Sequence, residues 1–508
     1  MPDQSGLNPF VFACEGGLVL DRSTFAMQPG MALELENFEP DTKGGYRRIN
    51  GYEKWNSNIV PQTTLSSEAV LMSAYYKGKV IAARGEKVFE GGATGSWTEI
   101  DSGRTGATKY THFRYNLGGE DYIVWADGAN NATKYDGTTV TDLNASGAPS
   151  DPKFVTGFKD ALFFAGMSAS PQEIIFTSPF TDDDFNTANG AGSIAVDSNI
   201  TALFPFRDQL FIFCEERIFR LAGNTVADFV LQPVTREIGC LNGFTVQEFA
   251  GDIVFLGPDG LRTVAGTERI GDVELGTISR AVQERFEKAN IFDEFDSLVI
   301  PDKTQYRIFF VDSANRTQAQ TKGIICVRKG NNYEFAETKG IQPSCTDFAT
   351  TEAPDGTIGQ TFILHGGFDG YVYRQEQGNT FDGGTIVGRY RSPDLTMGDA
   401  GIRKTFQRVI INYAPEGIVS SDLFLRYDYE APDVPRPAAY PFDSSSVVAL
   451  YGTSLYGTAT YGGQTNPLVR QAVEGSGFSV AMRVVDSGVS VPYSLKGFQL
   501  EFDVGSRR

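Results

Sequence analysis

Few residues in this chain could carry nucleophilic or zinc chemistry. It holds only two histidines, His112 and His365, among 508 residues. A zinc site with several histidines is thereby excluded, and a Ser-His-Asp or Cys-His arrangement would have to use one of these two. Both lie in strand-like contexts, Tyr-Thr-His-Phe and Ile-Leu-His-Gly, which favours hydrogen-bonded structural roles.

The cysteines also lack the spacing of a reactive or metal-binding motif. There are five of them, none in a Cys-x-x-Cys pair: Cys14, Cys214, Cys240, Cys326 and Cys345. Their odd number and apolar neighbours indicate reduced, buried thiols. The first residues lack the cationic region of a signal peptide, and no apolar run is long enough for a membrane span. We therefore expect synthesis in a reducing cytoplasm.

One acidic run deserves comparison with calcium-binding loops. Asp182-Asp183-Asp184 supplies oxygen ligands, but Thr187 and Ser193 stand where such a loop has Gly and Glu. The sequence therefore favours an ordinary solvated turn over a metal site.

Paired acidic residues could in principle serve a glycosidase, which needs two carboxyl groups across a cleft. Glu215 with Glu216, and Asp293 with Asp296, are such pairs, but a solvated acidic surface is the preferred interpretation. The chain has no P-loop, no G-x-G-x-x-G before a helix and no G-x-S-x-G elbow. We expect no enzyme activity, no catalytic residue, no cofactor and no metal.

The overall composition narrows the fold and the partners. Against 44 Lys and Arg stand 63 Asp and Glu, a net charge of -19, so no global basic surface exists to hold nucleic acid phosphates. Glycine is abundant at 56 residues, and 38 Phe and 21 Tyr dominate the aromatics. This composition is typical of strands joined by turns.

A repeat organises the middle of the chain. Two short β-rich runs joined by a turn recur from positions 79, 121, 161, 209, 252, 306 and 362. These spacings resemble those of four-stranded propeller blades, at roughly 40–50 residues. In the clearest copy, Pro258-Asp259-Gly260 supplies the turn. The sequence thus predicts an all-β fold with a β-propeller of five to seven blades; a run of β-meanders forming sandwiches is the alternative.

The repeat and its flanks suggest three parts. Residues 1–60, with short strand-like pieces between Gly-rich turns, are expected to form an extended leader that docks on the propeller. Residues 61–380 form the predicted propeller, in which the first run of each repeat, apolar throughout, is expected to be an inner strand covered on both faces. Residues 381–508 carry longer strand patterns and predict an antiparallel β-sandwich-like C-terminal domain.

Three stretches resemble structural proteins of tailed bacteriophages, specifically the tail nozzle, or tail tubular protein B-like, component of short-tailed phages. The leader segments are Gly17-Leu-Val-Leu20, Pro29–Leu33, Asn37-Phe38, Gly44–Arg48 and Gly51–Glu53. The propeller segments are Ile200–Leu210, Ile218–Leu221, Asp228-Phe229, Thr235–Cys240 and Asp252–Leu275. The closing segments are Tyr390–Pro393, Arg403–Phe406, Gly497–Phe502 and Arg507-Arg508. The resemblance spans most of the chain, and its motifs carry no catalytic residue.

The resemblance implies a structural virion protein of the phage tail. In that family a homo-oligomeric ring, typically a hexamer, extends and gates the DNA channel below the portal and adaptor. Its implied partners are the adaptor or head-to-tail connector protein, tail fibres, and double-stranded DNA that passes without sequence-specific binding. The alternative from a different class is a propeller glycoside hydrolase or carbohydrate-binding protein.

An insertion in the C-terminal part offers a candidate contact between ring subunits. It is low in charge, stiffened by prolines from Pro432 to Pro437, and carries Tyr451, Tyr456 and Tyr461, each followed by glycine. Tyrosine is favoured in interface cores. An exposed surface loop is the other interpretation of this segment.

Overall fold

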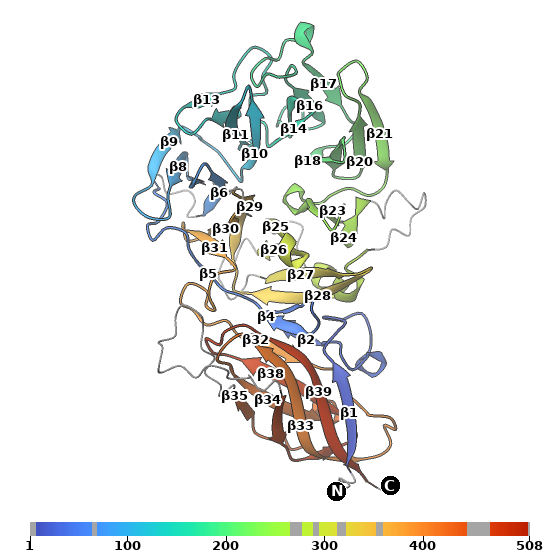
Figure 1. The fold of residues 1–508 in the computed structure, drawn as a ribbon. Helices are drawn as coiled ribbons and strands as arrows, with labels where there is room; N and C mark the ends of the chain where they lie inside the picture. The colour runs from blue at the N-terminus through green and yellow to red at the C-terminus, as the bar shows by residue number, and fades with distance from the viewer. Residues whose placement is uncertain are drawn as a thin grey trace.

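Nearly all of the chain forms β-strands. The structure, a computed structural model, describes residues 7–62, 69–264, 277–287, 294–311, 322–351, 359–443 and 468–505. It is 6% helical and combines a six-bladed β-propeller with further strand-rich sheets towards the C-terminus. The prediction of an all-β propeller with five to seven blades is confirmed. Figure 1 shows the propeller at one end of the molecule and the second group of sheets at the other.

Six self-contained antiparallel sheets form the blades. The first three are β6–β9 (Val70–Tyr76, Lys79–Arg84, Lys87–Gly91, Thr98–Ser102), β10–β13 (Thr111–Leu117, Glu120–Ala126, Thr133–Tyr135, Val140–Asp142) and β14–β17 (Phe154–Phe158, Ala161–Ala165, Glu173–Phe176, Gly192–Ala195). The others are β18–β21 (Ile200–Phe206, Gln209–Cys214, Ile218–Ala222, Val230–Thr235), β22–β24 (Gln247–Phe249, Asp252–Gly257, Gly260–Thr263) and β29–β31 (Pro343–Thr350, Thr361–Gly367, Val372–Gln375) with β5 (Tyr52–Lys54).

A further four-stranded unit, separate from these six sheets, lies between β22–β24 and β29–β31, where its first strand contacts β22 and β29. It consists of β25 (Glu294–Ile300), β26 (Gln305–Val311), β27 (Lys322–Lys329) and β28 (Asn332–Lys339). This unit is not self-contained, because it belongs to a nine-stranded sheet that runs on into the C-terminal part.

The apolar run of each repeat is the second strand of its blade, not the innermost one. In β15 and β19 every residue after the first is buried. The innermost strands, such as β10 and β18, precede them and keep many half-buried positions. A second strand is covered by the neighbouring blades on both faces, whereas an innermost strand presents one edge to the propeller axis, so its side chains can be polar.

The second part is a sandwich of two sheets. One contains β3 (Phe38–Pro40), β4 (Tyr46–Arg48), β39 (Tyr493–Val504), β33 (Lys404–Pro415) and β36 (Leu468–Ala472), with β1 (Asn8–Ala13) on β39 and β37 (Ser476–Gly477) on β33. The other contains β32 (Gly388–Arg391), β38 (Val480–Asp486), β34 (Ser420–Tyr427) and β35 (Tyr440–Asp443). Rings from the two sheets meet in the core: Tyr390 stacks on Phe498 with centroids 5.8 Å apart, and Phe406 stacks on Tyr427 at 5.4 Å.

The N-terminal segment is distributed over both parts. Its strands β1, β3 and β4 belong to the sandwich, whereas β5 is the outer strand of the β29–β31 blade, where Tyr52 lies opposite Gln375. Between them, β2 (Glu34–Glu36) pairs with β28 on one side and β32 on the other, and so joins the propeller and sandwich portions of the nine-stranded sheet. The first 60 residues thus connect the two parts.

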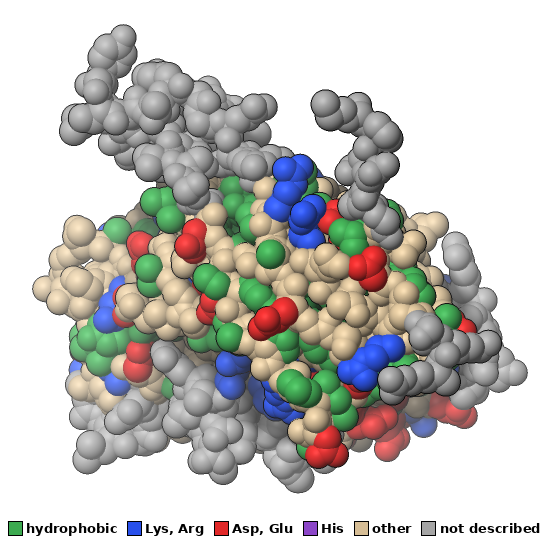
Figure 2. Space-filling view, turned by 90° about the horizontal axis from the view of Figure 1, so that it is seen from below, with side chains coloured by type: hydrophobic (Ala, Val, Ile, Leu, Met, Phe, Trp, Pro, Cys, Tyr) green, Lys and Arg blue, Asp and Glu red, His purple; other side chains and the backbone are tan. Residues whose placement is uncertain are grey.

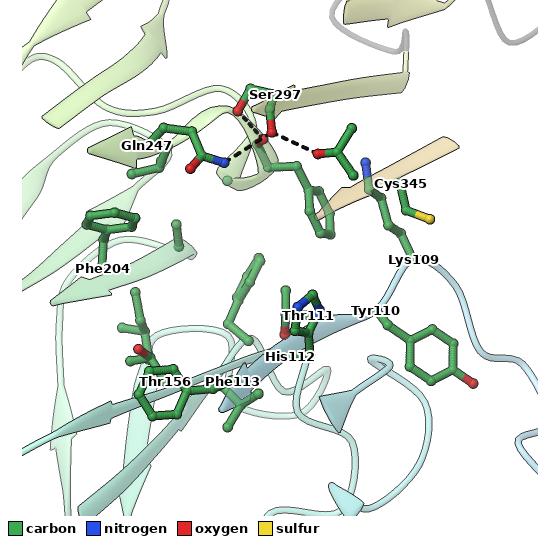
Figure 3. Close-up of a pocket in the computed structure, with 18 of the residues that line it drawn as sticks. Lys109, Tyr110, Thr111, His112, Phe113, Thr156, Phe204, Gln247, Ser297 and Cys345 are labelled. Atoms are coloured by element: carbon green, nitrogen blue, oxygen red, sulfur yellow. Dashed lines mark hydrogen bonds between the residues drawn. The ribbon is translucent and has the colours of Figure 1, made fainter. Parts of the chain in front are cut away.

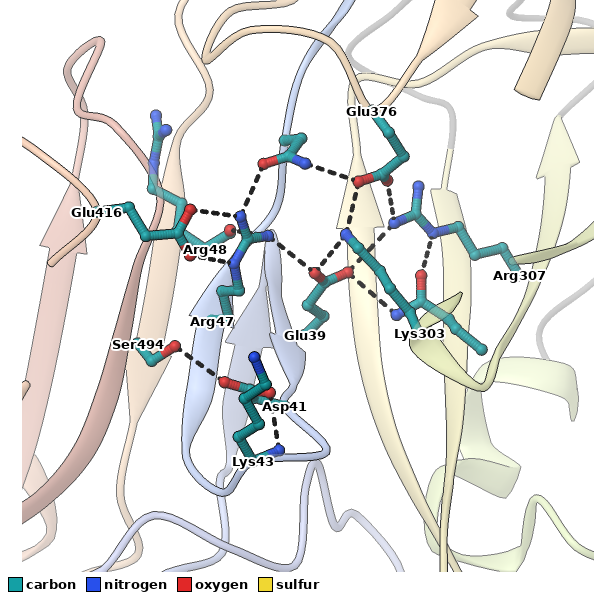
Figure 4. Close-up of polar contacts among 12 residues, drawn as sticks. Glu39, Asp41, Lys43, Arg47, Arg48, Lys303, Arg307, Glu376, Glu416 and Ser494 are labelled. Carbon is teal, nitrogen blue, oxygen red and sulfur yellow. Dashed lines mark hydrogen bonds and ion pairs between the residues drawn. The ribbon is translucent and has the colours of Figure 1, made fainter. Parts of the chain in front are cut away.

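A network of buried charges lies where these parts meet (Figure 4). Glu39 on β3 contacts Lys303 at 2.7 Å and the guanidinium of Arg307 on β26 at 3.2 Å. Glu376, just after β31, accepts hydrogen bonds from the same two cations, both at 2.6 Å. Burial alone would raise the pKa of Glu376, but Lys303 and Arg307 together hold it well below its usual range.

A second buried ion pair ties the leader to the sandwich. Arg48 on β4 is fully buried and lies 3.3 Å from Asp486 at the end of β38. Its guanidinium also donates to the carbonyl oxygens of Ser490 at 2.6 Å and Ile386 at 2.9 Å. One side chain thus connects β4 with two distant loops.

We expect Arg48→Ala to lower the free energy of unfolding by about 3 kcal/mol, because it leaves the buried Asp486 carboxylate and three carbonyl groups, those of Ser490, Ile386 and Gly488, without their partner. Urea denaturation followed by fluorescence measures this loss. Arg22→Ala is the matched control: Arg22 pairs with Asp21 at the surface, so its loss should cost less than about 0.5 kcal/mol. Equal effects of the two variants would contradict the assigned role.

All five cysteines are free and buried, as the sequence predicts. Burial raises the pKa of Cys240 to about 11 and that of Cys214 to about 12. These thiols are therefore protonated and shielded at neutral pH.

A reducing agent should accordingly leave the melting temperature unchanged, because there is no disulfide to break. Differential scanning fluorimetry with and without a phosphine reductant tests this. A melting temperature several degrees lower with reductant would reveal a bond between cysteines.

Candidate functional site

The three tyrosines proposed as a subunit contact, Tyr451, Tyr456 and Tyr461, lie outside the described residues.

The acidic run at Asp182 forms a turn whose carboxylates are held by contacts within the protein. Asp182 accepts a hydrogen bond from Lys134 at 2.7 Å. Among the residues described, no cluster of three His, Cys, Asp or Glu could hold a metal ion.

The two histidines have different surroundings. His365 on β30 is buried, stacks on Tyr373 with centroids 5.0 Å apart, and meets the edge of Tyr52 from the leader. Burial lowers its pKa to about 3, so it is neutral and structural. His112 on β10 instead lines a cavity on the propeller axis.

This cavity is the candidate site. It has a volume of about 360 Å³ and is surrounded by the innermost strands of several blades, among them β10, β14, β18, β22 and β29, and by β25 of the further four-stranded unit. A second cavity of about 720 Å³ adjoins it and shares six lining residues: His112, Phe204, Gln247, Glu248, Ser297 and Thr346. Figure 3 shows these walls, with Phe204 and Gln247 across from His112. We call the two cavities together the channel site.

One charged pair in the channel site is already neutralised. The ammonium of Lys109 lies 2.5 Å from the Asp296 carboxylate and 4.3 Å from the ring centroid of Phe244. Thr346 donates a further hydrogen bond to Asp296 at 2.7 Å. Asp296 was one of the acidic residues considered as a glycosidase carboxylate, and here it is held by a cation.

Asp347 forms the second pair. Its carboxylate contacts Arg114 at 2.5 Å and His112 Nε2 at 3.2 Å, and accepts the backbone N–H of Tyr75 at 2.9 Å. Burial alone would raise the pKa of Asp347, but Arg114, His112 and the Tyr75 amide hold it well below its usual range. This carboxylate is ionised at neutral pH and fixed in place. In the His112 tautomer that donates Nε2–H to Asp347, Nδ1 is an acceptor.

The polar groups that remain offer acceptor atoms, and the Thr156 hydroxyl can also donate. Gln247 donates from Nε2 to the Ser297 carbonyl at 3.1 Å, which leaves its side-chain oxygen for a ligand. Glu248 is exposed, and Thr156, although only 4% exposed, makes no hydrogen bond through its hydroxyl to any residue the structure describes. The site thus offers hydrogen-bond acceptors to a small polar molecule. It does not place two uncommitted carboxylates across a cleft within the described residues, as a glycosidase would need.

Sequence reasoning did not find this site. Its members come from strands more than 200 residues apart and share no motif, and only the polar positions in the innermost strands could have indicated it.

In the described residues no helix is long and apolar enough to cross a membrane.

The sequence matches no protein-family model and no curated protein. Solved structures similar to the chain include the computationally designed Ika8 protein, at 11% identity over 64% of this chain and 99% of that one, with a TM-score of 0.36. The AfRom2 CNH domain is 9% identical over 63% of this chain and 99% of its own, at 0.35. An exo-beta-1,3-galactanase from Phanerochaete chrysosporium is 8% identical over 90% and 100%, at 0.25. At these TM-scores none of them bears on function.

We expect Asp347→Asn to lower the free energy of unfolding at pH 7 by about 2–3 kcal/mol, because Arg114 and His112 lose their charged partner. The native carboxyl has a lowered pKa, so its contribution is present above the usual value near 3.8 and declines as the pH falls through the folded value. The gap between variant and wild type should therefore narrow below about pH 4.

Urea denaturation at pH 7 and at pH 3 measures both effects. Asp208→Asn serves as the control, because Asp208 pairs with Lys159 while its side chain is 92% exposed. A gap that is the same at both pH values would contradict the assigned ionisation.

Proposed function

We propose that this chain is a structural virion protein of a bacteriophage tail, and that copies of it form a nozzle ring extending and gating the DNA channel below the portal and adaptor. The proposal begins from the resemblance of the leader, propeller and closing segments to that family. These segments now have positions: Gly44–Arg48 forms the β3–β4 turn and β4, and Gly497–Phe502 lies in β39.

The connection between propeller and sandwich is the observation that carries the proposal. A ring subunit under load from packaged DNA must transmit force between its parts without their separating. Here β2 joins the two portions of one nine-stranded sheet, and Glu39, Lys303, Arg307 and Glu376 bury opposite charges across the same junction. Breaking such a pair leaves an uncompensated buried charge, so the junction resists opening.

The charge of the chain suits a channel through which DNA slides. At a net charge of -19 the subunit repels phosphates. Seen from the sandwich end, Figure 2 shows acidic and basic side chains interspersed with hydrophobic ones over the visible face.

The sandwich strands also expose hydrophobic residues, among them Val11 and Val504, whose exposed fractions are 67% and 51%. Exposed apolar side chains suit contacts with a protein partner such as the adaptor or connector.

A ring closes by heterologous contacts, in which one surface of each subunit meets a different surface of the next. We propose the insertion with Tyr451, Tyr456 and Tyr461 as one side of this contact, from its sequence. The virion tail is the proposed location, after synthesis in the host cytoplasm.

Sedimentation of the purified full-length chain tests the proposal. We expect a discrete ring, a hexamer of 55.4 kDa chains, visible as a ring by negative-stain electron microscopy. A species that stays monomeric at micromolar concentration, alone and with a head-to-tail connector ring, would overturn the proposal. A monomer that hydrolyses glycosides would establish the alternative function, a propeller glycoside hydrolase.

Replacing all three tyrosines by serine should weaken ring assembly by at least about tenfold in dissociation constant, because aromatic anchors carry much of the energy of an interface. Analytical ultracentrifugation over a concentration series measures it, and circular dichroism should show an unchanged β fold. Tyr429→Ser, at a side chain 49% exposed, is the control. Hexamers as stable as wild type would place the contact on the propeller flanks instead.

A further inference from the structure

The channel site has an excess of negative charge and of hydrogen-bond acceptors, which the proposed ring function does not require. Its built-in charges are neutralised in pairs, Lys109 by Asp296 and Asp347 by Arg114. The one charged lining residue that remains is Glu248, an exposed carboxylate without a cation among the described residues. The site therefore has a surplus of one negative charge.

The uncommitted polar groups point to the same kind of ligand. The side-chain oxygen of Gln247 can accept hydrogen bonds, as can Nδ1 of His112 in the tautomer that donates Nε2–H to Asp347, and the buried Thr156 hydroxyl can accept one as well. A ligand that satisfies several acceptors must be rich in N–H or O–H donors. An ammonium group carries three such donors, whereas a carboxylate or phosphate carries none at neutral pH.

Aromatic rings complete the wall. Phe113, Phe154, Phe204 and Phe244 line the cavity, and Phe204 makes no ring contact among the described residues. Lys109 provides an example of a cation bound at this aromatic wall, since its ammonium lies over the Phe244 ring and beside the Asp296 carboxylate. Cations over aromatic faces are stabilised by the electrostatic field of the ring, more strongly when water is excluded.

We propose that the channel site binds an aliphatic diamine or polyamine, with a primary ammonium held by the Glu248 carboxylate and the side-chain oxygen of Gln247. The hydrocarbon stem lies against Phe204, and the second ammonium reaches the acceptors at His112 and Thr156. Adjoining cavities of about 360 and 720 Å³ have room for such a chain. This inference does not rest on ring formation, because every residue involved belongs to one subunit.

Isothermal titration calorimetry of the full-length chain tests it, with putrescine and spermidine as probes and 1,4-butanediol as the uncharged analogue of putrescine. At about 0.15 M NaCl, where screening is strong, we expect one saturable site per chain for at least one amine, with a dissociation constant below about 1 mM. The diol should not bind. Binding of the diol as tight as that of putrescine would overturn the ammonium assignment in favour of a hydroxyl-rich ligand.

Variants separate the channel from general attraction to an acidic protein. Glu248→Gln and Phe204→Leu should each weaken amine binding by at least about fivefold, whereas Glu216→Gln, which removes an exposed acid outside the channel, should not change it. Equal losses for Glu248→Gln and Glu216→Gln, or heat that vanishes at this salt concentration, would show non-specific attraction and overturn the proposal. Should Phe204→Leu unfold, Gln247→Ala gives the second readout, with an expected loss in the same direction.

Discussion

Removing a charged group from water costs several kcal/mol unless opposite charges and hydrogen bonds surround it. At the junction of propeller and sandwich, Arg307 and Glu39 are almost completely buried, and each is surrounded in this way by partners from different parts of the chain. The network exists only when β3, β26 and the residue after β31 are all in place. The relative position of the two parts therefore depends on it.

The leader makes this arrangement possible. It passes from the sandwich to the last blade within about 50 residues and contributes strands to both. Its strands are short, so they contribute little apolar area alone, and their anchors are side chains that reach across the junction. Arg47, for example, contacts Glu39 at 3.3 Å and Glu416 at the end of β33 at 2.6 Å.

The same pairing of charges shapes the propeller axis. Innermost strands carry polar side chains because one edge faces the channel, and each charge that they bury needs a partner. Lys109 with Asp296, and Asp347 with Arg114, meet that need. The polar groups without a partner inside the protein, chiefly the side chains of Glu248 and Gln247, then favour a ligand that is positively charged and rich in hydrogen-bond donors.

The blades could be predicted from local sequence patterns. Strand, turn and strand are neighbours along the chain, so the Pro258-Asp259-Gly260 turn could be predicted, and β23 and β24 do pair on either side of it, Gly257 opposite Gly260. Composition likewise indicated buried free thiols. Where the leader strands pair, which strand of a repeat is innermost and which residues meet in the channel depend on contacts between distant parts of the chain, and no local pattern predicts them. Those contacts join residues as far apart in the chain as Asn8 and Phe502. Short strands that pair at such distances carry no local sequence pattern that identifies the partner strand.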